Sequence, residues 1–291
     1  MKKIYIIKSF SLSQIIEILI MITKKFNRIV REIIKVANII VEVLDARNPL
    51  GTRSKRLEVM INSYDDKKLV LFLNKIDLVP IHIIKKWELY LSKEYPTFYG
   101  SDRRRYQKSM RFFKGKIMNI IKKRPIHVCL IGYPNVGKSS IINALRGKKV
   151  APISPNAGFT QGEKNIKLTS DNIYLIDTPG VIPYTEESEV ELVLKGAIRP
   201  DKIIHLMDSV EEIISIIKKE DLIKKYGIEF ESNDEFLKNL ARKRGKLLPG
   251  GVPDINTIAK IFINDFQRGK IPYYKIPPII NGRISNLYKN G

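Results

Sequence analysis

The strongest chemical signal in the sequence is the segment Gly132-Tyr-Pro-Asn-Val-Gly137-Lys138-Ser139. Its pattern of a glycine, four residues and then Gly-Lys-Ser is typical of a loop that binds nucleotide phosphates. The glycines let backbone N–H groups curl around phosphate oxygens, and the following helix adds a favourable dipole at its N-terminus. We expect Lys138 to reach the β- and γ-phosphates and the Ser139 hydroxyl to bind Mg²⁺. The same phosphate site is predicted to include Asn135, Val136, Gly137 and Ser140.

A second motif, Asn74-Lys75-Ile76-Asp77, is suited to selecting the base. A carboxylate at Asp77 can accept two hydrogen bonds, from the N1–H and the amino group of guanine. Adenine has no N1–H, so the carboxylate would face an acceptor, and a buried polar group without a partner costs about 1–3 kcal/mol. Paired with the phosphate loop, Asn74, Lys75 and Asp77 therefore predict a guanine-nucleotide site.

A third motif, Asp177-Thr178-Pro179-Gly180, follows an apolar run. We expect Asp177 to hold Mg²⁺ through water and the Gly180 N–H to reach a γ-phosphate, which only the triphosphate carries. Thr160 lies where a second hydroxyl ligand of Mg²⁺ would come from, although a plain loop threonine fits the sequence nearly as well. Lys138, Gly180 and Thr160 form the predicted catalytic set.

Four short apolar runs end just before polar or glycine residues, at 39–44, 69–73, 126–131 and 173–176. Runs of this kind are typical of strands buried on both faces of a parallel sheet. Ligands of such sheets gather beyond the carboxyl ends of the strands, so we expect the residues after these runs to share one crevice. Helical patterns separate the runs. After Pro200 we predict helices alone, over 203–219, 221–226, 233–244 and 255–267.

The order of the motifs is unusual because Asn74 precedes Gly132, whereas ordinary GTPases place the phosphate loop first. The strands can keep their places in the sheet while only the chain connections change. The predicted fold class is therefore α/β: a circularly permuted P-loop GTPase domain with a mainly parallel sheet, plus a small all-helical C-terminal domain. The expected boundaries are an N-terminal extension over 1–23, the GTPase domain over 24–200, the helical domain over 201–275 and a Pro-containing tail over 276–291.

The sequence resembles the circularly permuted GTPases of the YlqF/YawG type, which include bacterial, archaeal and nucleolar ribosome-assembly factors. The resemblance covers residues 24–278 and rests on the three motifs above and on four further segments. These segments are Asp45-Ala-Arg-Asn-Pro49, Leu240-Ala-Arg-Lys-Arg-Gly245, Gly250-Gly-Val-Pro-Asp254 and Asp265-Phe-Gln-Arg-Gly-Lys-Ile-Pro272.

Further roles are implied by the resemblance alone. Asn135 matches an asparagine that helps to bind K⁺ beside the phosphates in related potassium-activated GTPases. Val181 occupies the place of a water-orienting glutamine, and because an apolar side chain cannot orient water, the resemblance implies slow intrinsic hydrolysis. Ser101 matches the serine of the loop that closes over the base, although the family often has Ser-Ala where this chain has Ser101-Asp102. The implied ligands are GTP or GDP, Mg²⁺ and K⁺.

Composition restricts the partners. Lys and Arg number 52 against 30 Asp and Glu, a formal net charge of +22, which favours association with polyanions such as rRNA. An anionic membrane or a solvated surface without a partner is the alternative. Cys129 is the single cysteine, so no intrachain disulfide can form, in keeping with a reducing cytoplasm.

The N-terminal residues 15–22 are apolar, but Glu17 interrupts them and no stretch reaches the roughly 18 residues of a spanning helix. We therefore predict no stable membrane insertion, and we expect a monomeric, cytoplasmic protein. Residues 1–20 lie outside the resemblance, and Met21 could be the natural start.

Three functions remain open on the sequence. The first is a GTPase switch that binds rRNA and the large ribosomal subunit or its precursor during assembly and hydrolyses GTP slowly, with stimulation by the ribosome and K⁺. The second is a membrane- or protein-associated regulatory GTPase recruited through the N-terminal segment. The third, a non-hydrolysing RNA-binding module, is disfavoured because all three nucleotide motifs are intact.

Overall fold

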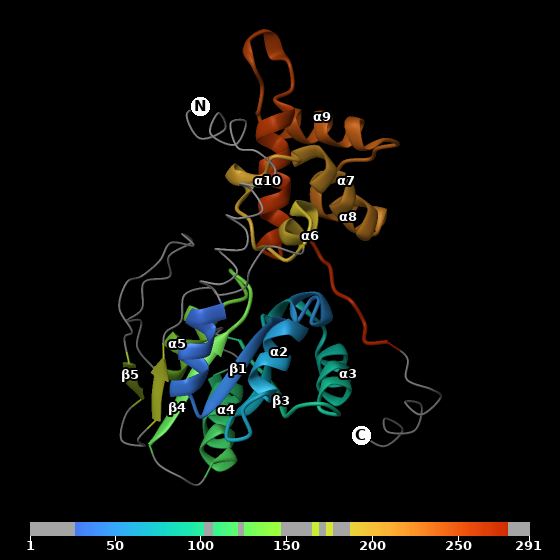
Figure 1. The fold of residues 1–291 in the computed structure, drawn as a ribbon. Helices are drawn as coiled ribbons and strands as arrows, with labels where there is room; N and C mark the ends of the chain where they lie inside the picture. The colour runs from blue at the N-terminus through green and yellow to red at the C-terminus, as the bar shows by residue number, and fades with distance from the viewer. Residues whose placement is uncertain are drawn as a thin grey trace, which may run out of the picture.

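The computed structural model describes residues 27–101, 107–121, 125–146, 165–168, 173–176 and 187–278. An α/β layer occupies the lower part of Figure 1, and a group of helices from the C-terminal third of the chain lies above it. Among the described helices, none combines the length and the apolar character needed to cross a bilayer. The α/β fold and the helical C-terminal region predicted from the sequence are both confirmed.

The sheet has six strands in the described residues, in the order β3-β2-β1-β4-β6-β5. All neighbouring pairs are parallel except β5–β6, which is antiparallel. Every residue of the central strand β1 is buried, as expected for a strand covered on both faces. The strands are β1 (Ile39–Asp45), β2 (Lys68–Asn74), β3 (Thr97–Tyr99), β4 (Ile126–Ile131), β5 (Asn165–Leu168) and β6 (Ile173–Ile176).

The four predicted strands are confirmed to within one residue at each end, whereas β3 and β5 were not predicted. Both are short edge strands, β3 of three residues and β5 of four, and neither carries a long apolar run. Strands at a sheet edge are covered less completely, so their sequences lose the continuous apolar pattern that marks the central strands.

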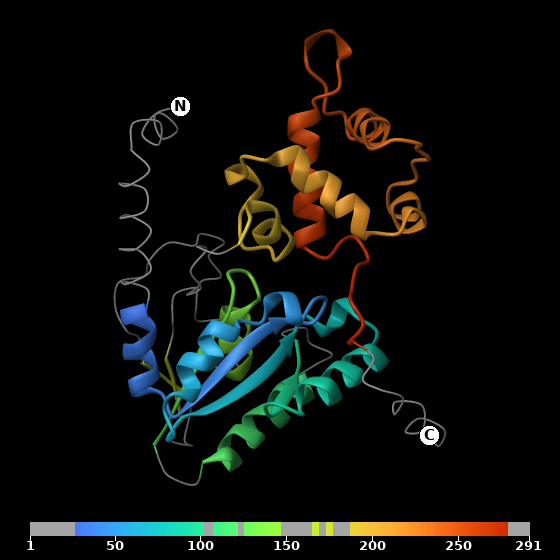
Figure 2. The same cartoon turned by 45° about the vertical axis from the view of Figure 1, so that its right-hand side comes forward.

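Helices cover both faces of the sheet, as Figures 1 and 2 show from two directions. They bury apolar side chains against it; Phe113 of α4, for example, packs on Phe72 of β2 with ring centroids 4.4 Å apart. The helices of this layer are residues 27–36, α2 (Lys55–Asn62), α3 (Ile81–Leu91), α4 (Gln107–Ile120) and α5 (Lys138–Arg146).

The C-terminal helices form their own apolar core around Phe236 and Phe262, whose rings meet edge to face at 5.5 Å. Ser188, Ser232 and Asp254 begin three of these helices, each accepting a backbone N–H with its side chain, which satisfies otherwise unpaired donors. The helices are α6 (Glu189–Leu194), α7 (Leu206–Ile216), α8 (Lys219–Tyr226), α9 (Asn233–Lys243) and α10 (Ile255–Gln267).

The structure corrects one prediction about this region and adds one helix. The helix expected over 203–219 is shorter, because the backbone adopts an extended conformation at Ile217, before α8 begins. Helix α6 was not predicted and lies before Pro200. It contributes Leu192 to the core of the α/β layer and Val193 to the core of the C-terminal helices, so it packs against both.

The chain after α10 returns to the α/β layer. The Lys275 N–H donates to the Arg47 carbonyl at 2.8 Å, and the indole N–H of Trp87 donates to the Lys275 carbonyl at 2.8 Å. Trp87 is buried in an apolar cluster of this layer, and its one polar atom is satisfied by the returning chain.

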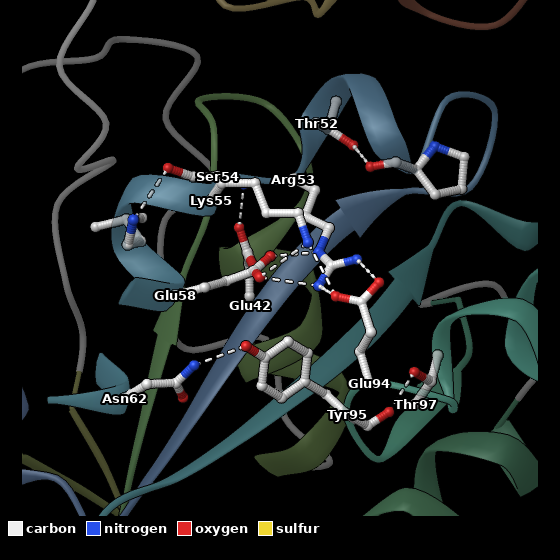
Figure 3. A network of polar contacts seen from close by, with 12 residues as sticks. Glu42, Thr52, Arg53, Ser54, Lys55, Glu58, Asn62, Glu94, Tyr95 and Thr97 are labelled. Atoms are coloured by element: carbon white, nitrogen blue, oxygen red, sulfur yellow. Dashed lines mark hydrogen bonds and ion pairs between the residues drawn. The ribbon is translucent and has the colours of Figure 1, made fainter. Parts of the chain in front are cut away.

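A buried polar network connects β1 to α2 (Figure 3). The Glu42 carboxylate accepts the Ser54 N–H at 2.6 Å, while its other oxygen has no partner among the described residues. Nearby, Arg53 forms ion pairs with Glu58 and Glu94. Burial raises the pKa of Glu42 to about 8, and the neighbouring Glu58 adds to the rise. Glu42 is therefore a protonated acid at neutral pH.

Replacing Glu42 with Gln should flatten the dependence of stability on pH. Between the unfolded pKa of 4.5 and the folded pKa of about 8, folded Glu42 binds a proton that the unfolded chain has lost. The free energy of unfolding therefore falls as pH rises through this window, by up to about 1.4 kcal/mol per pH unit. Urea titrations of wild type and Glu42→Gln from pH 5 to about 8.5 measure this dependence.

The exposed Glu211→Gln variant serves as the control and should retain the wild-type profile. Parallel profiles for wild type and Glu42→Gln would show that Glu42 is ionised in the folded protein.

Candidate nucleotide-binding site

The predicted phosphate loop joins β4 to α5, and two of its glycines are required by the backbone. Gly132 has φ +143°, and a Cβ there would lie 2.5 Å from the Val43 carbonyl oxygen. Gly137 has φ +99°, and its Cβ would lie 2.2 Å from Nδ2 of Asn74. Larger residues would push the loop away from β1 and from the base-selecting motif. Because the loop follows the last residue of β4, it lies at the carboxyl end of the sheet, where parallel α/β sheets bind ligands.

Lys138 begins α5 and folds back across this loop. Its ammonium donates to the carbonyls of Gly132 and Tyr133, both at 2.8 Å. Ser139 and Ser140 follow in the first turn of α5, and both are half-buried. The positive end of the helix dipole and the Lys138 charge thus meet at one point, which is the arrangement that binds phosphate.

The base-selecting motif follows β2, and the structure brings it against the phosphate loop. The buried Asn74 side chain donates from Nδ2 to the Val136 carbonyl at 2.8 Å. The Asn74 Oδ1 atom is buried and has no hydrogen-bond partner among the described residues. A buried polar atom without a partner beside a phosphate loop is suited to a bound ligand. Two motifs far apart in the permuted sequence therefore form one site.

Asp77 and Ser101 meet at the other end of this site. Asp77 lies in a short 3-10 turn over Ile76–Leu78, and Ser101 follows β3, the neighbour of β2 in the sheet. The buried Ser101 hydroxyl donates to Asp77 Oδ1 at 2.8 Å. The strand pairing thus places the predicted base-closing serine directly on the predicted base-selecting carboxylate.

Lys75 adopts the left-handed conformation, with φ 61°, and reaches back to β1. Its ammonium lies 2.9 Å from Oδ2 of Asp45, which is the last residue of β1. The Arg47 guanidinium binds the same carboxylate with Nε at 3.0 Å and Nη2 at 2.7 Å. Burial alone would raise the pKa of Asp45, but the charges of Lys75 and Arg47 hold it well below its ordinary value. Asp45 is therefore an anion between two cations.

Arg47 also binds the end of α10. Its guanidinium donates to the carbonyls of Phe266 at 2.8 Å and Gln267 at 3.3 Å, and it lies over the Phe266 ring at 5.8 Å. These carbonyls lie in the last turn of α10 and carry the negative end of its dipole; the Phe266 carbonyl also accepts the Gly269 N–H at 2.9 Å. The base-selecting motif is thus joined to the C-terminal helices through the charged side chains of Lys75, Asp45 and Arg47.

The phosphate loop has its own contacts with the residues that flank α6. The Asn135 side chain donates to the Gly196 carbonyl at 2.7 Å. The Tyr133 hydroxyl donates to Glu187, which also pairs with Lys195 at 2.8 Å. Burial and the Glu187 carboxylate raise the pKa of Tyr133 above its ordinary value, so the hydroxyl keeps its proton and remains a donor.

The remaining predicted residues, Asp177, Gly180, Thr160 and Val181, lie outside the described residues. Their assignment to Mg²⁺, to the γ-phosphate and to slow hydrolysis stays a prediction. Sequence reasoning assigned no chemical role to Arg47 or Tyr133. Arg47 belongs to a segment that carried the family resemblance, whereas nothing in the sequence around Tyr133 pointed to its contact with Glu187.

Comparison with protein families agrees with this geometry. A family model described as "50S ribosome-binding GTPase" matches residues 127–242. "Nuclear/nucleolar GTPase 2" of Oryza sativa subsp. indica is 41% identical over 259 residues, covering 85% of this chain and 47% of that protein. "Nucleolar GTP-binding protein 2" of Saccharomyces cerevisiae is 38% identical over 267 residues, covering 86% of this chain and 54% of that protein. The chain thus spans about half the length of the curated relatives it matches.

Among solved structures, GNP-bound YlqF from T. maritima superposes with a TM-score of 0.63 and 27% sequence identity, covering 86% of this chain and 97% of that chain. The GDP-bound structure of the same protein gives a TM-score of 0.62 at 27% identity, covering 85% of this chain and 98% of that chain. The permuted arrangement of the α/β layer and the added helices therefore occur together in a protein crystallised with guanine nucleotides.

Replacing Arg47 with Met should lower the free energy of unfolding by about 3–5 kcal/mol, because Asp45 and the α10 carbonyls lose their buried counter-charge. Loss of Arg47 also removes one of the two cations that hold Asp45, the partner of Lys75, so GDP should dissociate faster. Urea titration and stopped-flow release of a fluorescent GDP measure the two effects.

Arg268→Met is the matched control, since Arg268 is exposed and lies one residue beyond α10. If Arg47→Met and Arg268→Met unfolded at the same urea concentration, the buried cluster would have no role in holding the two parts together.

Proposed function

We propose that the chain is a circularly permuted GTPase of the YlqF type, which binds GTP and GDP with Mg²⁺ and hydrolyses GTP slowly. It acts as a switch in assembly of the large ribosomal subunit, through contacts with rRNA and the ribosomal particle. The observation that carries the nucleotide site is the 2.8 Å contact between Asn74 and the Val136 carbonyl, which joins base selection to phosphate binding.

Guanine is selected by Asp77. Its carboxylate accepts hydrogen bonds from N1–H and the amino group, while Ser101 holds Oδ1 from behind at 2.8 Å. The fixed carboxylate needs no reorientation when the base binds, which favours guanine over any base that lacks these donors.

Hydrolysis depends on positioning and charge neutralisation. Lys138 leaves the loop carbonyls for the β- and γ-phosphates, and Ser139 is the described residue that would hold Mg²⁺, with Asp177 and Thr160 completing the set. The metal supplies charge neutralisation on the phosphate oxygens. Asn135 donates its amide N–H to Gly196, and its carbonyl oxygen is the atom that would bind K⁺. Gly180 senses the γ-phosphate through its N–H.

The switch acts on the C-terminal helices by two routes. Tyr133 and Asn135 of the phosphate loop contact the residues at either end of α6, and Lys75 of the base motif reaches α10 through Asp45 and Arg47. Exchange of nucleotide shifts the placement of these helices, and by linkage a ribosome that favours one placement changes nucleotide affinity.

Partners follow from charge and from the relatives. The net charge of +22 supports rRNA as the partner, and the affinity of the chain for rRNA should fall as salt concentration rises. The names of the relatives place those proteins in the nucleus or nucleolus. A monomeric state and a cytoplasmic location for this chain stay predictions. No observation on the described residues favours the membrane-associated alternative, and residues 1–20, on which it depends, lie outside them.

Replacing Asp77 with Asn should exchange guanine for xanthine specificity. Asn can donate to the O2 carbonyl of xanthine but can no longer accept from the guanine amino group, so GDP affinity should fall at least about a hundredfold. Competition of GDP, XDP and ADP against a fluorescent nucleotide measures the change. Glu88→Gln on α3 removes a neighbouring carboxylate outside the site and should leave the order of affinities unaltered. Retained GDP preference in Asp77→Asn would contradict the assignment.

Large ribosomal subunits and K⁺ should each accelerate hydrolysis. Phosphate release is measured in KCl and in NaCl of equal ionic strength, with and without purified large subunits. Lys138→Ala should abolish the activity, and Asn135→Leu should remove the advantage of KCl over NaCl. Equal rates under all four conditions in the wild-type protein would exclude the switch as proposed.

A further inference from the structure

The end of the C-terminal helices farthest from the sheet carries a protruding loop. This distal loop, residues 246–254, joins α9 to α10 and stands clear of the other helices in both Figures 1 and 2. Three large aliphatic side chains on it face solvent: Leu247 is 46% exposed, Leu248 48% and Val252 55%. Aliphatic side chains gathered on one projecting loop are typical of a contact surface.

The distal loop is held in a defined shape although its side chains are exposed. Leu248 donates its N–H to the Val252 carbonyl at 2.8 Å, and Asp254 donates to the Lys246 carbonyl at 2.9 Å. Gly250 and Gly251 turn the chain with φ of 81° and 78°, conformations that suit glycine. A loop with its backbone bonds already made loses little conformational entropy when it binds, so the aliphatic tip is preorganised.

The chain that leads into this tip is basic. No acidic residue occurs between Glu235 and Asp254, whereas five basic residues do. Lys243 and Arg244 are committed to the Tyr226 carbonyl and to Asp265. Arg242 donates to the neutral Asn239 amide oxygen, and among the described residues neither Arg242 nor Lys246 forms an ion pair. Both cations are exposed; Lys246 directly precedes Leu247, and Arg242 lies in the last turn of α9, just before the loop.

We propose that the distal loop and the C-terminal end of α9 form a contact surface for folded RNA. Arg242 and Lys246 neutralise phosphates, and Leu247, Leu248 and Val252 pack against the faces of unpaired bases. Phosphate and base are adjacent in every nucleotide, so the pattern of cations beside an apolar tip matches RNA whose bases are unstacked. Aliphatic wedges of this kind unstack bases in other nucleic-acid complexes.

This inference rests on the proposed function, because it names the part of the chain that reads rRNA. It adds a second requirement to general electrostatic attraction. A fully paired duplex presents phosphates but hides the base faces, so it can satisfy the cations and leave the aliphatic tip in water. The surface should therefore prefer RNA with unpaired bases.

The test uses the full chain and two fluorescent RNAs, a stem-loop with an unpaired loop and a blunt duplex of equal length. Fluorescence anisotropy gives their affinities over a series of KCl concentrations. The Leu247→Ser/Leu248→Ser variant should lose roughly tenfold in affinity for the stem-loop, little for the duplex, and keep its salt dependence. The Arg242→Gln/Lys246→Gln variant should lower the slope of log affinity against log salt by about 1.4.

Matched controls separate the distal loop from exposure and charge in general. Val59→Ser/Ile204→Ser removes two aliphatic side chains that are 71% and 77% exposed elsewhere. Lys224→Gln/Lys225→Gln removes two exposed cations of α8. Both controls should bind the stem-loop as the wild type does. Fluorescent GDP titration of all variants should give wild-type affinity. A protein that binds the stem-loop but not GDP would contradict the proposed function and leave the assignment of the distal loop unaffected.

Equal losses in the loop variants and their controls would overturn the proposal. So would wild-type stem-loop affinity in the Leu247→Ser/Leu248→Ser variant. If that variant kept RNA binding but lost association with large subunits, the tip would contact a ribosomal protein instead. If it lost only co-sedimentation with phosphatidylserine vesicles, the tip would contact anionic lipid.

Discussion

The buried contact of Asp45 with Lys75 and Arg47 is the interaction on which the two parts of the molecule depend. Removing a carboxylate from water is costly, and here the cost is offset by two cations within 3.0 Å. Each cation also has a second task, since Lys75 sits within the base-selecting motif and Arg47 binds the last carbonyls of α10.

A second contact joins the two nucleotide motifs, which the permuted connection separates in the chain. When the base-selecting strand comes early in the chain and the phosphate loop follows it, hydrogen bonds have to hold the two motifs together across the sheet. The parallel order β2-β1-β4 places them side by side, and the Asn74 amide joins them. The phosphate loop also contacts the residues that flank α6, so the nucleotide site and the C-terminal helices are joined by direct contacts.

Two regions of the molecule suit two kinds of contact: the junction between the α/β layer and the C-terminal helices, and the distal loop. At the junction of the two parts, charges are buried and paired, and the arrangement favours a small number of discrete placements of the helices. At the distal loop, charges and aliphatic side chains remain exposed on a preorganised backbone. A nucleotide-dependent shift at the junction would thus be carried as a rigid movement to a surface far from the bound nucleotide, which is what a switch on a large particle requires.

The sequence alone determined the class of fold, the four central strands and the guanine-nucleotide motifs. Each of these depends on local features: a continuous apolar run, a glycine spacing, or a carboxylate next to a strand end. Only the tertiary structure showed that Ser101 binds Asp77, that Tyr133 binds Glu187, and that Arg47 reaches Phe266, 219 residues away in the chain. Such contacts could not be read from residue types, because many exposed or buried partners were possible for each side chain. Strand order and helix packing decide which of these partners comes within hydrogen-bonding distance.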